Sequence, residues 1–202
     1  MIKNNNQKKF FQNYFQSVKN TVDEIDINKI IEICNYVEKT IKLKKKIFVA
    51  GNGGSASVSN HFLCDFNKGI KISSKKKIIP KVHSLSNSIE LITAISNDIN
   101  YDKIFEFQLE NHAEKGDLFF AMSCSGTSKN IKKAISFAVK KKMNIVFITG
   151  FCSEKINPKV TFHYDLNCKN YGITEDVFSS FMHLISQWIR FKSSNYNSKK
   201  IL

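Results

Sequence analysis

Residues 44–66 read KKKIFVAGNGGSASVSNHFLCDF and join a short apolar run to a glycine-rich turn. The run from Ile47 to Ala50 has the length and composition of a buried strand. Three glycines in the turn, residues 51–55, leave backbone N–H groups open to a ligand, and a helix predicted over about 55–67 starts behind them. This arrangement favours an anion at the helix N-terminus, although a simple tight turn would also explain the glycines. The turn is neither a dinucleotide fingerprint, because G-x-G-x-x-G is absent, nor a P-loop, because no Gly-Lys-Ser/Thr follows.

The remaining chain alternates predicted strands and helices, which is typical of an α/β protein. Strands are predicted at 46–50, 78–86, 116–123, 143–151 and 160–166. Helices are predicted at 6–22, 27–45, 55–67, 87–95, 125–142 and 173–191, and residues 96–113 are predicted to form a turn followed by an amphipathic helix. Because the strands are apolar throughout, we expect a parallel sheet covered by helices on both faces, in a doubly wound, Rossmann-like arrangement. A sheet of this kind binds ligands at the carboxyl ends of its strands.

The expected organisation is a single domain over residues 1–202. Its N-terminal helices occupy about 6–45, its sheet core about 46–168 and its C-terminal helix about 173–191. The tail after Lys192 is expected to fray. Asn87 or Ser88 is placed to cap the helix that follows it.

Composition restricts the class of protein. The formal charge is +14, but Arg190 is the only arginine, and arginine is the usual reader of bases and phosphates in nucleic acids. Nucleic-acid binding therefore rests on charge alone. No apolar stretch approaches the roughly 20 residues that span a bilayer, and the N-terminus lacks the apolar region of a signal peptide. The five cysteines contain no C-x-x-C pair, which argues against a disulfide framework and a cysteine zinc site and favours a reducing cytoplasm.

A second unusual loop, SCSGTS at residues 123–128, also lies between a predicted buried strand and a helix. It offers the hydroxyls of Ser123, Ser125, Thr127 and Ser128, and Gly126 allows a sharp turn. Capping the helix would need only one of these hydroxyls. Hydroxyls and backbone N–H groups at a helix N-terminus form a neutral cradle for phosphate. We infer a phosphate monoester of something small and polar as the ligand.

Four segments together carry a family resemblance: GNGGSAS…NHF, SNDINYDKIF, GDLFFAMSCSGTSKNIKKAI and MNIVFITGF. In this order and spacing they resemble the SIS (sugar isomerase) domain, and more closely its phosphoheptose isomerases, over roughly residues 10–191. The resemblance implies conversion of sedoheptulose 7-phosphate to D-glycero-D-manno-heptose 7-phosphate, which feeds lipopolysaccharide or capsule synthesis. It also implies a cytoplasmic homotetramer with active sites where subunits meet, and one zinc ion per subunit.

The family's site residues are carried over position by position. The resemblance implies that the sugar phosphate contacts the serine loop and the glycine turn, at Asn52, Gly53, Gly54, Ser55, Ser123, Ser125 and Ser128. Asn97 and Asp98 would contact the sugar hydroxyls, and Glu175 stands where the family has a glutamine that helps to bind substrate. The family's zinc ligands correspond to His61, Asp65, Glu175 and His183.

The chemistry of a ketose–aldose isomerase suits these groups, because one group must take a carbon-bound proton and another must protonate the carbonyl oxygen. His61 and Asp65 are spaced i, i+4, so both lie on one helix face. Asp65 would be the base and His183 the acid on the opposite side.

Two departures from the family stand out. Asp65 is one methylene shorter than the family's glutamate, and Glu175 replaces a neutral amide with a carboxylate. In addition, Glu175 and His183 are eight residues apart, a rise of about 12 Å along a helix, so Asp176 is an alternative partner for the metal.

Alternatives remain at this stage. The chain could be a non-catalytic SIS protein that binds a sugar phosphate or a replication initiator, with an intact phosphate loop and a weakened acid–base pair. His61 and Asp65 could be a surface pair, and His183 a core histidine. The other site neighbours are expected to be structural: His83, His112, His163, Cys64, Cys124, Tyr171 and Trp188.

Overall fold

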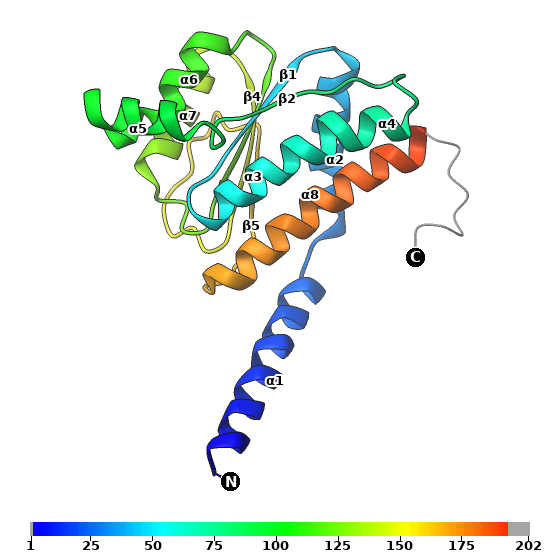
Figure 1. Cartoon of the computed structure of the whole chain (residues 1–202), viewed down its shortest axis with the longest axis vertical. Coiled ribbons are helices and arrows are strands. Elements are labelled where there is room, and N and C mark those ends of the chain that lie inside the picture. The colour runs from blue at the N-terminus through cyan, green and yellow to red at the C-terminus, as the bar shows by residue number, and fades with distance from the viewer. Residues whose placement is uncertain (1, 194–202) are drawn as a thin grey trace.

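The protein folds around one parallel five-stranded sheet, seen in a computed structural model that describes residues 2–193 (Figure 1). The strand order is β2-β1-β3-β4-β5, and every neighbouring pair is parallel. The strands are β1 (Lys46–Ala50), β2 (Lys81–Ser84), β3 (Leu118–Ser123), β4 (Asn144–Thr149) and β5 (Phe162–Asp165). The predicted doubly wound α/β sheet is therefore confirmed, and each strand lies within its predicted range.

Helices cover both faces of the sheet, as Figure 1 shows. One face packs against α2 (Ile27–Lys42), α3 (Gly54–Cys64) and α8 (Tyr171–Ser193), and the other against α5 (Ile89–Asp98), α6 (Ile104–His112) and α7 (Lys129–Lys140). Along β3, Phe119 points into one layer and Phe120 into the other, and both are fully buried. The central strands β1, β3 and β4 are buried on both faces, which explains why they carry no polar alternation, whereas β2 and β5 are only partly buried.

Two helix ends are explained by local features, a capping side chain and a backbone angle that a helix does not contain. Ser88 caps α5 by accepting a hydrogen bond from the Leu91 backbone N–H at 3.4 Å, which selects between the two predicted caps. The helix predicted at 27–45 ends earlier, at Lys42, because Lys44 adopts a φ of +55° that a helix does not contain.

The helix predicted at 55–67 is longer than expected. After α3 the chain continues without a break through the π-helical segment η1 (Asp65–Ile70) and the short α4 (Lys71–Ser73). The turn and helix predicted over 96–113 are seen as a 3-10 turn, η2 (Tyr101–Lys103), that leads into α6. A π-helical segment within an α-helix is rare and often occurs at functional sites.

The first helix, α1 (Ile2–Asp23), extends away from the body of the molecule (Figure 1). Phe10, Phe11 and Phe15 on it are 66%, 51% and 71% exposed. Its contact with the body includes a hydrogen bond from the Tyr14 hydroxyl to the Asp176 carboxylate, at 3.4 Å. An exposed row of phenylalanines is unusual for a helix that meets only water.

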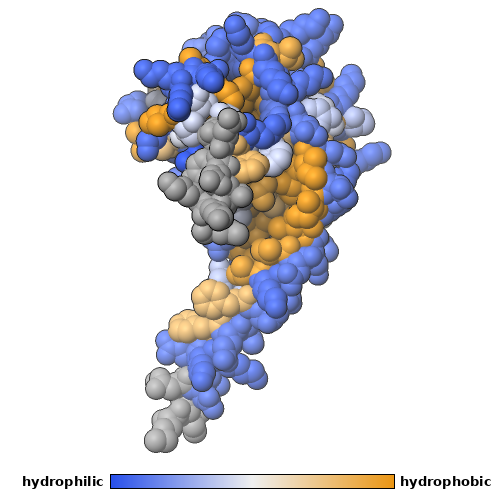
Figure 2. Space-filling view, turned by 90° about the vertical axis from the view of Figure 1, so that its right-hand side faces the viewer, coloured by the Kyte–Doolittle hydropathy of each residue, from blue (hydrophilic) through white to orange (hydrophobic). Residues whose placement is uncertain are grey.

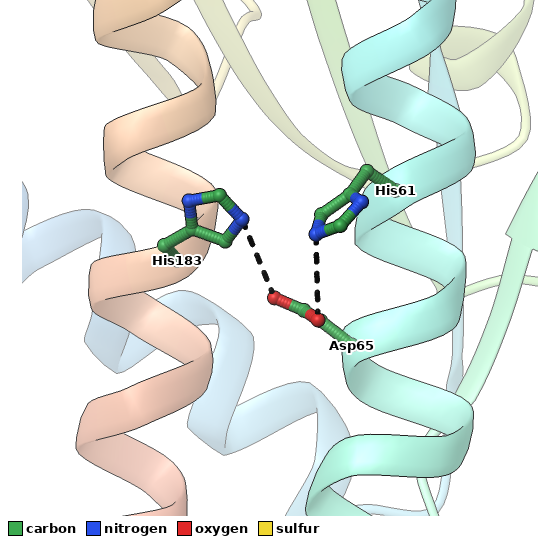
Figure 3. A group of neighbouring side chains, drawn as sticks. All are labelled: His61, Asp65 and His183. Atoms are coloured by element: carbon green, nitrogen blue, oxygen red, sulfur yellow. Dashed lines mark ion pairs between the residues drawn. The ribbon is translucent and has the colours of Figure 1, made fainter.

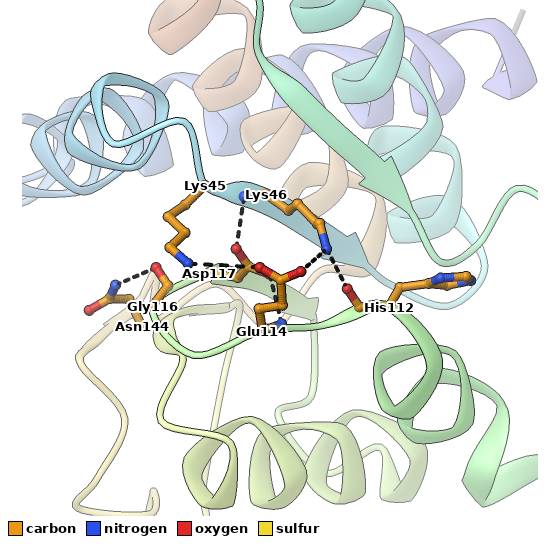
Figure 4. Close-up of polar contacts among 7 residues, drawn as sticks. All are labelled: Lys45, Lys46, His112, Glu114, Gly116, Asp117 and Asn144. Atoms are coloured by element: carbon orange, nitrogen blue, oxygen red, sulfur yellow. Dashed lines mark hydrogen bonds and ion pairs between the residues drawn. The ribbon is translucent and has the colours of Figure 1, made fainter.

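A polar network closes the amino ends of the central strands (Figure 4). The fully buried Asp117 carboxylate accepts hydrogen bonds from the backbone N–H groups of Lys46, at 2.9 Å, and Glu114, at 2.8 Å. The Lys46 ammonium donates to the His112 carbonyl, at 2.8 Å, and pairs with the Glu114 carboxylate, at 3.0 Å. This end of the sheet is thus occupied by structural bonds, while the carboxyl ends carry the two unusual loops.

Residues 194–202, most of the tail that the sequence predicts to fray, lie outside the described residues. Among the helices described, none is both long enough and apolar enough to cross a membrane.

Candidate active site

The two unusual loops lie side by side because the strands that precede them are neighbours. Ala50, the last residue of β1, pairs with Ala121 near the end of β3. The segments that follow β1 and β3 then turn at the same edge of the sheet, where α3 and α7 begin. The Ser55 hydroxyl and the Cys124 thiol are 3.8 Å apart across the two loops. The predicted meeting of the glycine turn and the serine loop is therefore seen in the structure.

Two positions in the turn require glycine, each for a different physical reason. Gly53 adopts a φ of +54°, which side-chain-bearing residues rarely adopt. Gly51 has no room for a side chain, since a Cβ there would lie 2.6 Å from the Ser55 Cβ and 2.7 Å from the Ser55 backbone. The first turn of α3 thus packs directly on the end of β1, and its N–H groups face the loop edge.

The serine loop keeps its hydroxyls together. Ser123 and Ser128 are 3.1 Å apart at their Oγ atoms, and Ser125 and Thr127 are 2.8 Å apart at theirs. Ser128 is the N-cap residue of α7 but makes no side-chain capping bond. Capping therefore does not explain the hydroxyls, which supports the phosphate interpretation of the loop.

An amide network fixes one side of the glycine turn. Asn52 and Asn130 exchange two side-chain hydrogen bonds of 2.9 Å, and the Tyr101 hydroxyl donates to the Asn52 Oδ1 at 3.0 Å. Asn52 Oδ1 thus accepts two bonds, while one N–H of its amide remains to donate. Sequence reasoning missed Asn130 and Tyr101, because no local pattern marks either residue.

The acid–base residues form a second cluster, on α3, η1 and α8 (Figure 3). His61 Nε2 lies 3.6 Å from Asp65 Oδ1, and His183 Nε2 lies 3.9 Å from Asp65 Oδ2. The two imidazole rings are perpendicular, with centroids 4.9 Å apart. The carboxylate therefore lies between the two histidines, as the sequence predicts, and the three side chains remain partly open to solvent, at 53%, 23% and 42% exposure for His61, Asp65 and His183.

Ser186 completes this cluster and was also missed from the sequence. Its hydroxyl lies one turn beyond His183, 3.2 Å from Asp65 Oδ2 and 3.0 Å from the His183 carbonyl oxygen. The side chain is fully buried. A serine three residues after a histidine carries no sequence signal of its own.

Glu175 is not brought into this cluster. Helices α3 and α8 run alongside each other in the same direction, with Glu175 beside the start of α3 and His183 beside its end (Figure 1). The Glu175 carboxylate lies over Gly54, where a Cβ would come within 2.0 Å of its Oε2, and accepts a weak bond from the Cys124 thiol at 3.8 Å. Asp176 bonds to Tyr14 on α1. The structure brings three of the four expected metal ligands together, and the part of Glu175 in a metal set stays a prediction.

The predicted sugar-binding pair lies apart from both groups. Asn97 and Asp98 end α5, and the Asn97 amide donates to the Asp98 carboxylate at 2.8 Å. In the described part of the chain, neither side chain bonds to the glycine turn or the serine loop. Their contact with sugar hydroxyls stays a prediction.

The His–Asp–His group has the donor chemistry of a metal site. One ligand atom from each of His61, Asp65 and His183 lies within 4.8 Å of the others. Ligand atoms about 2.0–2.2 Å from a tetrahedral zinc lie roughly 3.3–3.6 Å from one another, so small side-chain movements would close the observed gaps. Three protein ligands would leave one position open, as catalytic zinc sites do.

The side chains expected to be structural lie as follows. His83 stacks on Phe48 in the sheet, and His163 bonds to the buried Thr149 hydroxyl at 2.9 Å. Burial lowers the pKa of both histidines below its usual value. Burial also raises the pKa of the Cys124 thiol to about 11, so this cysteine is not activated.

Comparison with known proteins places this geometry in a family. The SIS domain model matches residues 11–150, more than two thirds of the chain. The phosphoheptose isomerase of Campylobacter concisus is 31% identical over 154 residues, which cover 76% of this chain and 80% of that protein. These findings favour a sugar phosphate isomerase over the non-catalytic alternative.

Solved structures show the same fold. A phosphoheptose isomerase from Neisseria gonorrhoeae superposes with a TM-score of 0.78 at 20% identity, over 91% of this chain and 97% of that one. One from Francisella tularensis gives a TM-score of 0.77 at 19% identity, over 94% and 98% of the two chains. From its sequence relatives and its fold together, the chain belongs to the SIS domain family, among its phosphoheptose-isomerase-like members.

Proposed function

We propose that this chain is a phosphoheptose isomerase that converts sedoheptulose 7-phosphate to D-glycero-D-manno-heptose 7-phosphate for lipopolysaccharide or capsule synthesis. The observation that carries the proposal is the placement of two different groups along the paired helices α3 and α8. The phosphate-type loops lie at the start of α3, and the His–Asp–His cluster lies at its end. A substrate with a phosphate at one end and a carbonyl at the other needs this separation.

In the proposed reaction, Asp65 takes the proton from C1 while His183 gives a proton to the carbonyl oxygen at C2, which produces an enediol. Asp65 then returns a proton to C2, and His183 takes the proton from the oxygen at C1. Both groups end in their starting protonation states. His61 lies beside the other carboxylate oxygen, with its Nε2 3.6 Å from Asp65 Oδ1.

The serine loop and Asn52 would hold the phosphate through hydroxyls and backbone N–H groups. Glu175 lies over Gly54 and contacts Cys124 of the serine loop. A carboxylate there suits the sugar hydroxyls, from which it would accept hydrogen bonds.

A zinc ion is part of the proposal, held by His61, Asp65 and His183. Bound there, it would act as a Lewis acid toward the oxygens of the substrate. The donor set and the short separations of the three ligand atoms support it.

The proposal also includes assembly into a homotetramer. His183 lines a groove of about 870 Å³ between α2 and α8, together with Ile27, Ile31, Leu184 and Trp188. Figure 2 shows apolar side chains gathered on this face and further ones on α1. A second copy on this groove would bury the apolar surface and shield the half-open site from water. We place the enzyme in the cytoplasm, where its five free cysteines would stay reduced.

The test is deuterium incorporation. The purified protein is incubated with sedoheptulose 7-phosphate in D₂O, with and without added zinc, and deuterium at C1 is followed by NMR. We expect exchange in the wild type, a loss of at least about 100-fold in Asp65→Asn, and unchanged sugar phosphate binding in that variant. Asp23→Asn, at the exposed end of α1, is the matched control and should exchange at the wild-type rate.

A wild type that binds the sugar phosphate without exchange would refute the isomerase and support the non-catalytic alternative. Full exchange in Asp65→Asn would show that another group is the base. Comparing deuterium exchange with and without added zinc tests the role of the metal separately from the role of Asp65 as the base.

A further inference from the structure

We infer that Ser186 is a positioning residue that holds the Asp65 carboxylate between His61 and His183. The inference rests on the proposed function for the role of Asp65 but not for the geometry. Asp65 Oδ2 lies 3.2 Å from the Ser186 hydroxyl, within hydrogen-bond distance. The two histidine nitrogens are farther away, at 3.6 and 3.9 Å. In the part of the chain that the structure describes, this is the only side-chain hydrogen bond that the carboxylate accepts.

The position of Ser186 makes the contact rigid. Its side chain has no solvent exposure, whereas Asp65 and both histidines are partly open. A buried hydroxyl is expected to keep a hydrogen-bond partner, because leaving it unsatisfied is unfavourable. The hydroxyl has a single hydrogen and two acceptors in reach, the carboxylate and the His183 carbonyl, and a charged acceptor forms the stronger bond.

The contact matters in this chain because the carboxylate is short. Asp65 is also the first residue of η1, where the continuous helix changes from α to π geometry. The Asp65 carboxylate thus projects from the π-helical part of its own helix and accepts a hydrogen bond from Ser186 on the facing α8. Without the Ser186 bond, rotation about the aspartate side chain would carry the oxygens away from the histidines. A displacement of about 1 Å at a reacting group can cost roughly 100-fold in rate.

The experiment is a double-mutant cycle on the full-length protein. Ser186→Ala, Asp65→Glu and the double variant are compared with the wild type in deuterium exchange and in binding of sedoheptulose 7-phosphate by calorimetry. We expect Ser186→Ala to lower kcat for exchange about 10–100-fold and to change KM and binding less than about twofold. In the Asp65→Glu background the longer side chain reaches past the hydroxyl, so removal of Ser186 should change kcat less than about threefold.

A spectroscopic readout tests the geometry without turnover. The imidazole ¹⁵N signals of His61 and His183 should move in Ser186→Ala, because the carboxylate between them moves. Ser59→Ala is the matched control: Ser59 is equally buried on α3 and its hydroxyl donates to a backbone carbonyl, that of Ser55, at 2.9 Å. It should change neither the kcat nor the imidazole signals.

Equal losses of kcat from Ser186→Ala in the wild-type background and in the Asp65→Glu background would overturn the inference, since a general packing defect predicts that result. Unmoved imidazole signals in Ser186→Ala would overturn it as well. If the wild type showed no exchange, the isomerase proposal would fail, and the imidazole signals would still decide the role of Ser186.

Discussion

At the scale of single residues, Asn52 shows how neighbours decide what a side chain offers to a ligand. Its carbonyl oxygen is saturated by bonds from Asn130 and Tyr101, so only an N–H remains. An amide with only an N–H left to donate can bind the oxygens of a phosphate, but it cannot accept a hydrogen bond from a donor group of the ligand. Tyr101, itself 53% exposed, would thus act on a bound phosphate through Asn52.

Tyr101→Phe should therefore free Asn52 to rotate and weaken phosphate binding. We expect the Kd for sedoheptulose 7-phosphate, measured by calorimetry, to rise about 2–12-fold, which corresponds to the loss of one hydrogen bond. Tyr171→Phe is the control, since the Tyr171 hydroxyl makes no hydrogen bond in the described part of the chain. Equal affinities for the Tyr101→Phe variant and the wild type would contradict this account.

His163 gives a prediction on pH. Burial lowers its pKa in the folded protein, so the unfolded chain binds more protons below about pH 6.5. Its contribution to stability is complete above that pH and is lost as the pH falls toward the folded-state pKa. In urea titrations between pH 7 and pH 5, His163→Gln should show a smaller fall in unfolding free energy than the wild type. Parallel curves would show that His163 does not titrate on unfolding.

The sequence predicted residues well where they belong to a contiguous motif. His61 and Asp65 are one helical turn apart, and the hydroxyls of the serine loop are neighbours, so their grouping needs no tertiary information. Ser186, Asn130 and Tyr101 act through contacts across the fold, and no local pattern distinguishes them from surface residues. The eight-residue spacing of Glu175 and His183 already indicated a long separation along α8, but only the structure shows Glu175 beside Gly54.

At the scale of elements, apolar runs and turn residues predicted all five strands. The central strands β1, β3 and β4 are buried on both faces and have an unmistakable composition, whereas β2 and β5 are only partly buried. Helix lengths were less predictable. The extension of α3 through η1 and α4 depends on packing of Phe66 and Ile70, which are fully buried, and helical propensity did not indicate it.

The junction of β1 and α3 should be sensitive to one added methyl group. In Gly51→Ala, the new Cβ would meet the Ser55 backbone at 2.7 Å, and backbone cannot move aside as a flexible side chain can. We expect a loss of about 1–3 kcal/mol in unfolding free energy by urea titration. Gly69→Ala, in η1 with nothing within 4 Å of the new Cβ, is the control and should be neutral or stabilising by about 0.5–1 kcal/mol. Similar losses in both variants would mean that close packing at Gly51 is not the cause.

At the scale of the whole molecule, the exposed phenylalanines of α1 and the groove between α2 and α8 are two apolar surfaces open to a partner. The proposed tetramer would bury both. Phe15→Glu should then lower the molar mass measured by light scattering after size-exclusion chromatography. It should also lower the exchange activity, since His183 lines the groove.

Gln12→Glu places the same charge on an exposed polar position of the same helix and should leave the molar mass unchanged. If Phe15→Glu and the wild type had the same molar mass, the phenylalanine row of α1 would not be an assembly surface.

The projecting α1 has a consequence for how this protein responds to dilution. A helix of this kind keeps its shape in water mainly through what it packs against, so an isolated subunit would lose much of the order of α1. Folding of α1 would then be coupled to association of the subunits, so the melting temperature would rise with protein concentration. Below the concentration at which the proposed tetramer dissociates, the enzyme would become not only inactive but also a better substrate for proteases, with α1 cut first.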